Sequence, residues 1–296
     1  MRRSEALASL VAAPLISRCA FDPSAVRIAS KNFTESFLVA EIYAQALERA
    51  GLRVERLFNL GSTQIALAAM QRGNIDCYPE YTGTALVDVL HLPPQANPRI
   101  AYATVARQFE ARYGLEWLAP APMNDSQGLA TTREIAAREH LTTLSDVARA
   151  AGRLRLATIQ EFLARPDGLP GLQKFYGGFH FREVRTYDIA LKYRALLDGR
   201  ADVATAFTTD GAIATQSLVV LRDDGHFWPA YNIAPVVRAA TLRAHPNLRA
   251  VLDGISSRIT DAAARAMNDA VENKQRDPAD VAAAFLSSRD GGNTAS

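Results

Sequence analysis

The sequence contains few residues of the kinds that carry out catalysis or bind metals. Its 296 residues include only two cysteines and five histidines, and no two histidines stand at the spacing of metal ligands. It contains no HExxH, GxSxG or GxxxxGK[ST] motif, and no GxGxxG motif follows a strand-like segment. We therefore expect a binding protein that is not an enzyme and that needs no metal and no cofactor.

An excess of charge of one sign is also absent. The chain has 33 basic and 31 acidic residues, which give a net charge of +2. This balance argues against a nucleic-acid partner and against a polybasic membrane patch, and it favours a small, near-neutral partner. With 48% hydrophobic residues, the chain can bury a large core as one large domain or two modest ones.

Apolar runs long enough to cross a bilayer, about 20 residues, are lacking. The short run Ala6–Ile16 follows two arginines, which is typical of an export signal, so we expect residues 1–22 to be removed and the mature protein to be periplasmic. Cys19 is either part of that signal or a lipid anchor, although Arg18 departs from the small residue that lipoprotein signals place there.

Cys77 cannot form an internal disulfide alone, and we interpret it as a buried thiol.

Strand-like and helix-like segments alternate from Val26 onward. This pattern is typical of a mostly parallel sheet covered by helices, where ligands bind beyond the carboxyl ends of the strands. The proline-rich segments 91–98 and 118–125 interrupt the alternation, and it then restarts, which indicates a second α/β unit. We expect strands at 26–30, 53–60, 74–78, 128–132, 154–158, 181–187, 201–207 and 232–238, with helices between them and from residue 245 onward.

Two segments of the chain resemble each other. The stretch from Gly73 to Tyr81 and the stretch from Gly199 to Phe207 both follow a helix, begin with glycine and end in an aromatic residue before threonines. This internal similarity predicts two lobes that share a cleft. Each lobe would contribute one aromatic ring to the cleft, from the end of an equivalent strand. Aromatic rings at several strand ends can surround a cation that donates no hydrogen bonds, such as a quaternary ammonium group.

Longer motifs make the sequence similar to a known family. The segments are SKNFTESFLVAEIYAQALERAG, NLGSTQIALAAMQRGNIDCYPEYTGT, EFLARPDGLPGLQKFYG, FTTDG and LRDDGHFWPAYNIAPVVR. They resemble the glycine betaine/carnitine/choline substrate-binding proteins of ABC importers. The resemblance implies an α/β protein with a type II periplasmic-binding-protein fold, in which a hinge of crossing strands joins two lobes around a ligand cleft. We expect lobe 1 to comprise residues 23–125 and 231–296, and lobe 2 to comprise residues 126–230.

The resemblance also implies a set of ligand-binding residues. The cation cage corresponds to Tyr81, Phe207, Tyr231 and Gln127, the carboxylate clamp to Lys31, Thr84 and Arg165, and Ser36 and Asp125 are further candidates. Three positions depart from the family pattern: Phe207 replaces a tyrosine of many members, Gln127 stands where an aromatic residue is common, and Ser36 replaces a glutamine of some members. We interpret Tyr78 and Trp228 as core residues and expect Glu80 to anchor its loop by a salt bridge.

The implied function is that of an extracytoplasmic substrate-binding protein. It would bind a quaternary ammonium compound, of the glycine betaine type or choline or carnitine, and deliver it as a monomer to an ABC permease with its ATPase. A first alternative keeps the fold and the transport role but changes the cargo to ergothioneine or another hydroxylated betaine, since Gln127 can donate and accept hydrogen bonds. A second alternative is a ligand-sensing domain or an enzyme on the same fold.

Overall fold

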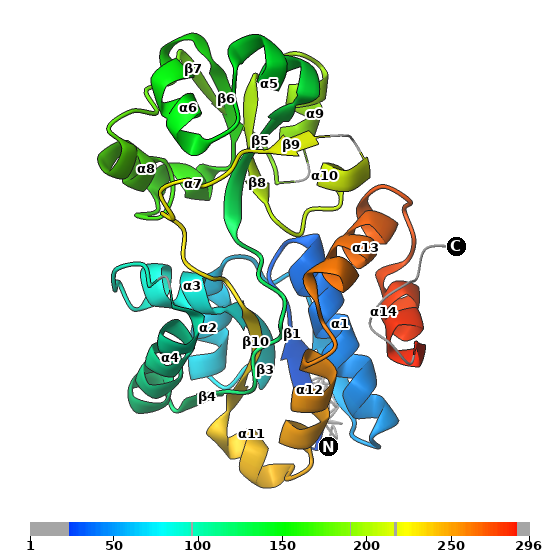
Figure 1. Ribbon diagram of the computed structural model, residues 1–296. Coiled ribbons are helices and arrows are strands. Elements are labelled where there is room, and N and C mark those ends of the chain that lie inside the picture. Colours follow the sequence, from blue (N-terminus) through cyan, green and yellow to red (C-terminus); the bar gives the residue numbers. More distant parts are fainter. Residues whose placement is uncertain (1–23, 96, 190, 216–217, 289–296) are drawn as a thin grey trace, which may run out of the picture.

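The computed structural model describes residues 24–95, 97–189, 191–215 and 218–288, which form two α/β lobes, one above the other in Figure 1. The predicted export signal, Cys19 and the final GGNTAS segment lie outside the described residues. Among the described residues, none of the helices combines the length and apolar character needed to cross a membrane.

Lobe 1, the lower lobe in Figure 1, is built on a sheet with the strand order β2-β1-β3-β10-β4. Its strands are β1 (Val26–Ala29), β2 (Val54–Leu57), β3 (Cys77–Tyr81), β4 (Leu115–Trp117) and β10 (Ile233–Arg238). Its helices are α1 (Thr34–Arg49), α2 (Thr63–Gln71), α3 (Thr82–Thr84), η1 (Ala85–Val89), α4 (Pro98–Tyr113), α11 (Ala239–Ala244), α12 (Leu248–Ser256), α13 (Asp261–Glu272) and α14 (Pro278–Ser287).

Lobe 2, the upper lobe, is built on a second sheet with the order β7-β6-β8-β5-β9. Its strands are β5 (Gln127–Thr132), β6 (Arg155–Thr158), β7 (Glu183–Thr186), β8 (Val203–Phe207) and β9 (Leu218–Val220). Its helices are α5 (Arg133–Glu139), α6 (Leu144–Ala150), η2 (Ala151–Arg153), α7 (Gln160–Ala164), α8 (Leu169–Tyr176), α9 (Lys192–Leu197) and α10 (Ala212–Thr215).

Both sheets are mixed, but each is mostly parallel as expected, because a single strand in each sheet runs against the other four. In lobe 1, β1 is parallel to β2 and β3, whereas β10 is antiparallel to β3 and β4. In lobe 2, β6 is parallel to β7 and β8, whereas β5 is antiparallel to β8 and β9. The antiparallel strands β5 and β10 follow the segments that cross between the lobes, and a strand that enters a sheet from the opposite lobe runs in the opposite direction.

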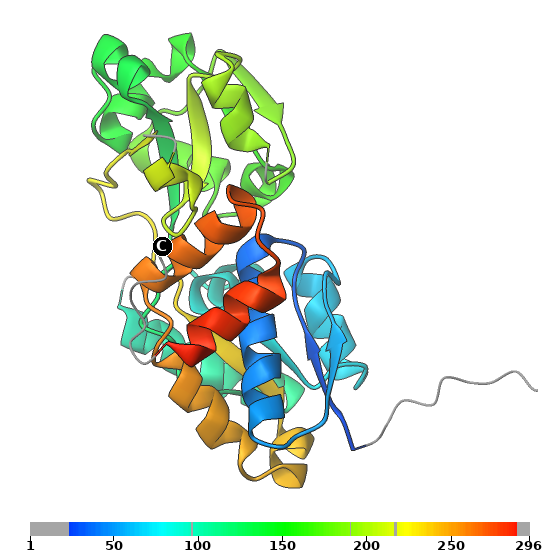
Figure 2. The ribbon, with the colours of Figure 1, turned by 90° about the vertical axis from the view of Figure 1, so that its right-hand side faces the viewer.

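The chain passes between the lobes through the segment before β5 and returns through the segment before β10 (Figure 1). Figure 2 shows helix α13 at the junction of the lobes, although it packs on α1 of lobe 1. The predicted boundaries at 125/126 and 230/231 remain a proposal, which the positions of these two crossings support.

Most helix ends follow the sequence signals. Thr260 and Asp277 cap α13 and α14, since their side chains accept hydrogen bonds from Ala263 N–H and Ala279 N–H. Helix α1 lacks such a cap, because Phe33 occupies the N-cap position and Thr34 is the first helical residue. The apolar face of α1 contributes fully buried side chains to the core of lobe 1, and each buried leucine or isoleucine stabilises the fold by about 1.5 to 3 kcal/mol.

The similarity between the two halves includes an ion pair at the equivalent place in each lobe. In lobe 1, Arg27 on β1 donates to Asp76, from Nε at 2.8 Å and from Nη2 at 3.0 Å. In lobe 2, Arg155 on β6 donates to Asp202 from the same two nitrogens, at 2.9 Å each. Both aspartates also accept a hydrogen bond from the backbone N–H of their arginine, so the pairs tie β1 to the start of β3 and β6 to the start of β8.

We expect Asp76→Asn to lower the free energy of unfolding by about 2 to 3 kcal/mol, because the substitution removes a buried charge that Arg27 and Arg238 contact. Burial opposes ionisation of Asp76, but the hydrogen bonds from Arg27 outweigh it and hold its pKa below the ordinary value. A lowered pKa in the folded state stabilises the protein above the ordinary carboxyl pKa, and this stabilisation is lost as the pH falls.

Denaturant unfolding near neutral pH measures this effect on the wild type and the variant. The matched control is Asp198→Asn, which removes an exposed ion pair with Arg200 and should change stability by less than about 0.5 kcal/mol. A midpoint for Asp76→Asn equal to that of the control would contradict the structural role of the pair.

Candidate functional site

The residues predicted to bind the ligand lie where the two sheets face each other. Tyr81 ends β3 and Phe207 ends β8, so both stand at carboxyl ends of strands. Gln127 begins the antiparallel β5 opposite Phe207, and Tyr231 lies just before the antiparallel β10, whose Ile233 pairs with Tyr81. This placement agrees with the expectation that ligands bind beyond the carboxyl ends of the strands.

Lys31 forms a buried ion pair on the lobe 1 side of this junction. Its Nζ donates to Glu80 Oε1 at 2.6 Å and to Thr63 Oγ1 at 3.3 Å. The ammonium group also lies 4.6 Å from the centre of the Tyr81 ring and 5.5 Å from that of Phe33. Glu80 therefore forms the predicted salt bridge, and the partner of Lys31 in this structure is an internal carboxylate.

Glu35 lies beside this cluster at the start of α1. Its two carboxylate oxygens accept hydrogen bonds from the Tyr81 hydroxyl at 2.7 Å and from Asn268 Nδ2 at 2.9 Å. The same Asn268 Nδ2 also donates to Thr209 O at 2.9 Å. Because Asn268 belongs to α13 of lobe 1 and Thr209 follows β8 of lobe 2, this amide group links the two lobes.

Asp125 contacts the same turn from the crossing segment. Its Oδ1 accepts a hydrogen bond from the Thr209 hydroxyl at 2.6 Å. Burial, followed by the negative charges of Glu35 and Asp210, raises the pKa of Asp125 well above its ordinary value. The pKa of Glu35 is raised as well, chiefly by burial, although hydrogen bonds from Thr209, Tyr81 and Asn268 oppose the shift. These two carboxyls thus make the junction a place where negative charge is costly.

Asp167 is the centre of a second network, on the lobe 2 side. This fully buried carboxylate accepts hydrogen bonds from the Tyr231 hydroxyl, from Gln127 Nε2 at 2.9 Å, and from Arg165 Nε and Nη2 at 2.8 and 2.6 Å. Its backbone oxygen accepts a hydrogen bond from Trp228 Nε1 at 2.8 Å. Trp228 is buried, in agreement with the interpretation as a core residue, and its indole N–H helps to hold the Asp167 loop.

Phe207 also faces an internal cation. The Nζ of the buried Lys192 lies 4.7 Å from the centre of the Phe207 ring and 4.6 Å from that of Tyr193. Lys192 Nζ also donates to Asp210 Oδ2 at 2.9 Å, and the Tyr193 hydroxyl donates to the same oxygen at 2.6 Å. Lobe 2 thus repeats the arrangement of lobe 1, with a lysine held between an aromatic ring and a carboxylate.

The structure brings some of the predicted site residues into contact and leaves others apart. Gln127 Nε2 donates to the Tyr231 hydroxyl at 3.2 Å, and the Lys31 backbone N–H donates to Ser36 Oγ at 2.9 Å. Lys31 and Arg165, expected to act together on one carboxylate, instead pair separately with Glu80 and Asp167. Thr84 is buried at the end of α3, and Tyr78 is buried in the core of lobe 1 as predicted.

Sequence reasoning did not assign a role at the junction to several residues that the contacts place there: Glu35, Asp167, Lys192, Tyr193, Asp210 and Asn268. Asp167 lies in the RPDG motif and Glu35 in the NFTES motif, so these motifs could have pointed to both residues. No motif points to Lys192 or Asn268. Their partners are distant in the sequence, and the helices that carry them have no unusual sequence pattern.

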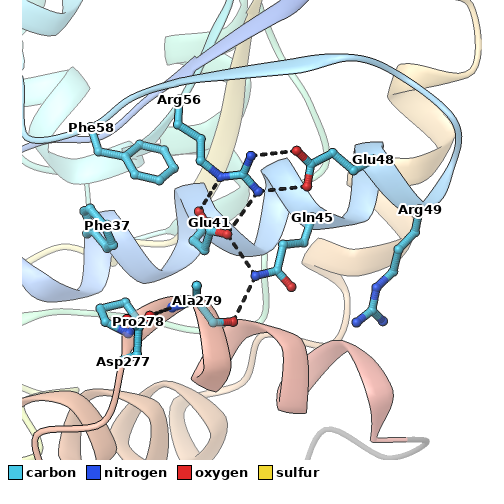
Figure 3. A pocket seen from close by; sticks show the side chains of 10 residues that line it. All are labelled: Phe37, Glu41, Gln45, Glu48, Arg49, Arg56, Phe58, Asp277, Pro278 and Ala279. Atoms are coloured by element: carbon cyan, nitrogen blue, oxygen red, sulfur yellow. Dashed lines mark hydrogen bonds and ion pairs between the residues drawn. The ribbon is translucent and has the colours of Figure 1, made fainter.

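A separate groove of about 840 Å³ lies on the outside of lobe 1, between α1 and α14 (Figure 3). Phe37 and Phe58 meet edge to face at its wall, with ring centres 4.7 Å apart. Arg56 also lines the groove and forms ion pairs with Glu41 at 2.8 Å and with Glu48 at 2.6 Å. Since the predicted site residues are not among those that line this groove, we do not assign the ligand to it.

The acidic residues at the junction are not arranged as a metal site. Within the part of the chain that the structure describes, no group of three or more histidine, cysteine, aspartate or glutamate side chains could hold a metal ion. The junction instead combines aromatic rings with paired and unpaired carboxylates. Such surroundings suit an organic cation, which interacts with ring faces and with negative charge without needing a fixed coordination geometry.

Comparisons with known proteins agree with this description. A family described as the substrate binding domain of ABC-type glycine betaine transport systems matches residues 24–288. A glycine-betaine-binding protein of Pseudomonas aeruginosa is 35% identical over 272 residues, which cover 88% of this chain and 86% of that protein. A solved structure of a glycine betaine/carnitine/choline ABC transporter protein has a TM-score of 0.75 and 30% identity, covering 88% of this chain and 97% of that one.

One relative has a different cargo. The ergothioneine transport permease/ergothioneine binding protein EgtU of Helicobacter pylori is 31% identical over 273 residues, which cover 92% of this chain. The match covers 49% of that relative, so this chain corresponds to about half of its length.

Proposed function

Because this chain belongs to the family of substrate-binding domains of ABC-type glycine betaine transport systems, we propose that it binds a quaternary ammonium compound between its lobes and delivers it to an ABC permease with an associated ATPase. We also propose that it acts as a monomer in the periplasm, either freely or through a lipid on Cys19. It performs no chemical reaction on its cargo.

The observation that carries this proposal is that aromatic residues from both lobes lie at one junction, where Tyr81 and Tyr231 are buried and Phe207 is partly buried. Tyr81 comes from lobe 1, Phe207 from lobe 2, and Tyr231 from the crossing segment between them. In the proposed cage, these rings and Gln127 surround the ligand's methylated nitrogen, and each desolvated ring contributes about 1 to 2 kcal/mol. Asp125 lies near Tyr81, and Ser36 accepts a hydrogen bond from the Lys31 backbone N–H; both are secondary members of the proposed site.

In the same proposal, Lys31, Thr84 and Arg165 supply the positive charge and the hydroxyl that a carboxylate-bearing ligand would require. The position of Arg165 supports this role, because its Nη1 lies 3.7 Å from Asp88 of lobe 1 and so spans the lobes. Its Nε and Nη2 are already held by Asp167, so a bound carboxylate would compete with an internal one.

A second cargo has specific support. One relative carries ergothioneine in its name, and Gln127 presents an amide where the family often has an aromatic ring. Gln127 already donates to Asp167 and to Tyr231, so it could exchange one of these hydrogen bonds for a polar group of the ligand. Ergothioneine or another hydroxylated betaine is therefore the alternative cargo.

A thermal-shift screen tests the proposed function. We expect at least one of glycine betaine, proline betaine, choline, carnitine and ergothioneine to raise the melting temperature by several degrees. A ligand at a hundred times its Kd stabilises the folded state by about 2.7 kcal/mol. Amino acids and sugars without a quaternary nitrogen serve as controls, and a shift produced only by these controls would contradict the proposed ligand class.

A further inference from the structure

Three basic groups at the junction are neutralised by carboxylates of the protein. Lys31 pairs with Glu80 at 2.6 Å, Arg165 with Asp167 at 2.6 Å, and Lys192 with Asp210 at 2.9 Å. A fourth basic group, Arg265, donates to the backbone oxygen of Thr208 at 3.0 Å. Two of the paired cations also lie against the rings of Tyr81 and Phe207. The three paired groups therefore offer little spare positive charge to the carboxylate of a zwitterionic ligand.

Glu35 and Asp125, in contrast, have no basic partner among the residues that the structure describes. Their side chains are 6% and 8% exposed, and they accept hydrogen bonds from the hydroxyls of Tyr81 and Thr209 and from the Asn268 amide. Hydrogen bonds to both oxygens of Glu35 favour its ionised form, yet burial raises its pKa. The hydrogen bonds thus partly offset the cost of the negative charge, while no basic side chain among the described residues pairs with these carboxyls.

The Asn268 side chain provides an independent indication of a ligand. Asn268 is 3% exposed, and its Oδ1 atom has no hydrogen-bond partner among the described residues. The orientation of the amide is well determined, because Nδ2 donates to Glu35 Oε2 and Thr209 O, and a flipped amide would place Oδ1 against these two acceptors. A buried acceptor without a donor costs about 1 to 3 kcal/mol, which a ligand hydroxyl could remove.

From these observations we infer that the junction selects a quaternary ammonium ligand with net positive charge and a hydroxyl group, of the choline class, over a zwitterionic betaine. Glu35 and Asp125 supply the countercharge for the methylated nitrogen, and Asn268 Oδ1 accepts the hydroxyl proton. The inference rests on the proposed function, since it concerns the same site. It narrows the ligand class within that function.

The physical basis is charge balance in a desolvated site. Two unit charges 4 Å apart interact by about 4 kcal/mol at an effective dielectric constant of 20, so two carboxylates near one cation strongly favour it. A betaine brings the same cation but adds a carboxylate, which the carboxylates of Glu35 and Asp125 repel. Its negative group would also have to displace Asp167 from Arg165 or Glu80 from Lys31.

Calorimetry with three probes tests the inference on the wild-type protein. The probes are choline, glycine betaine and the uncharged carbon analogue of choline, in which a tert-butyl group replaces the trimethylammonium group. We expect choline to bind at least about tenfold more tightly than glycine betaine, and the uncharged analogue to bind more weakly than choline. Equal or tighter binding of glycine betaine would overturn the inference and leave the proposed function intact. Binding of no quaternary ammonium compound at all would overturn both.

Two variants test whether the carboxylates of Glu35 and Asp125 determine the preference for choline over glycine betaine. Glu35→Gln and Asp125→Asn preserve size and hydrogen bonding, so we expect each to weaken choline binding about tenfold and to leave glycine betaine unchanged or tighter. Glu41→Gln is the control, because Glu41 is a buried carboxylate of the same helix that pairs with Arg56 at the outer groove. An equal loss of affinity for both ligands in the Glu35 and Asp125 variants would overturn the assignment.

The pH dependence gives a second readout. Cation binding favours ionised Glu35 and Asp125, so choline affinity should rise with pH above the ordinary carboxyl pKa, with release of protons. The other titratable and charged groups that face these two carboxyls are Tyr81 from β3, Lys192 and Tyr193 from α9, Asp210 after β8, and Glu272 from α13. A choline affinity that falls with rising pH would contradict the role of the carboxylates.

Discussion

Tyr81→Ala is expected to weaken the binding of every quaternary ammonium ligand by at least about a hundredfold. The substitution removes a ring face, worth up to about 2 kcal/mol towards a desolvated cation. It also removes the hydroxyl that donates to Glu35 Oε1 at 2.7 Å, a hydrogen bond to a charged group worth about 1.5 to 3 kcal/mol. The hydrogen bond also holds Glu35 in the proposed site, so the lost ring face and part of the lost hydrogen bond together reach the roughly 2.8 kcal/mol that correspond to a hundredfold change in Kd.

Tyr81→Phe separates these two contributions, because it keeps the ring and deletes only the hydroxyl. We expect it to weaken binding by about tenfold, less than alanine does. Tyr81 is 3% exposed, so the alanine variant also leaves a cavity that costs about 3 to 5 kcal/mol of stability. Calorimetry must therefore be done well below the melting temperature of each variant, with near-ultraviolet circular dichroism as a check of folding. Wild-type affinity in a folded Tyr81→Ala protein would rule out the cage.

The alternation of strands and helices could be read from the sequence because each segment carries its own local signal. Glycines with positive φ end the helices before β3 and β8, at Gly73 and Gly199, as the repeated pattern predicted. Helix α4 was missed because the prolines before it were interpreted as a break. Its start signal was present, since Asn97 accepts hydrogen bonds from the N–H groups of Arg99 and Ile100, and Pro98 occupies the first turn.

Strand direction and side-chain pairing were less accessible to sequence reasoning. Alternating apolar residues mark a strand but do not tell whether it joins the sheet parallel or antiparallel to its neighbours, so the antiparallel direction of β5 and β10 was not predicted. The family motifs drew attention to Lys31 and Arg165 as charges without revealing their internal partners. Those partners, Glu80 and Asp167, decide how much charge is left for a ligand, and only the folded geometry shows which groups are paired.

The contact between helix α13 and the turn after β8 suggests the second large effect. Gly211 lies in this turn, where a Cβ atom would stand 2.6 Å from the backbone nitrogen and 2.7 Å from the Cα atom of Asp269. Beside it, Arg265 Nη1 donates to Thr208 O at 3.0 Å, and Asn268 donates to Thr209 O. These contacts join the lobes, and a helix backbone cannot move aside as a flexible side chain can.

We therefore expect Gly211→Val to hold the lobes apart and to weaken ligand binding by at least about a hundredfold, with each lobe still folded. Overpacking costs about 1 to 3 kcal/mol where neighbours can adjust, and more where they cannot. The cost falls on the contact between the lobes, because the three atoms nearest to the added Cβ belong to α13. Gly152→Val is the matched control in lobe 2, since a Cβ at Gly152 meets no atom within 4 Å.

Small-angle X-ray scattering and calorimetry together measure the outcome for Gly211→Val. The variant should have a larger radius of gyration than the wild type and the control, an unchanged far-ultraviolet circular dichroism spectrum, and weak binding of the ligand. This combination would arise because contacts from both lobes are needed to enclose the cation, and opening the junction exposes Glu35 and Asp125 to water, where their charges attract it less. Wild-type compactness and affinity in Gly211→Val would show that lobe contact at α13 does not control binding.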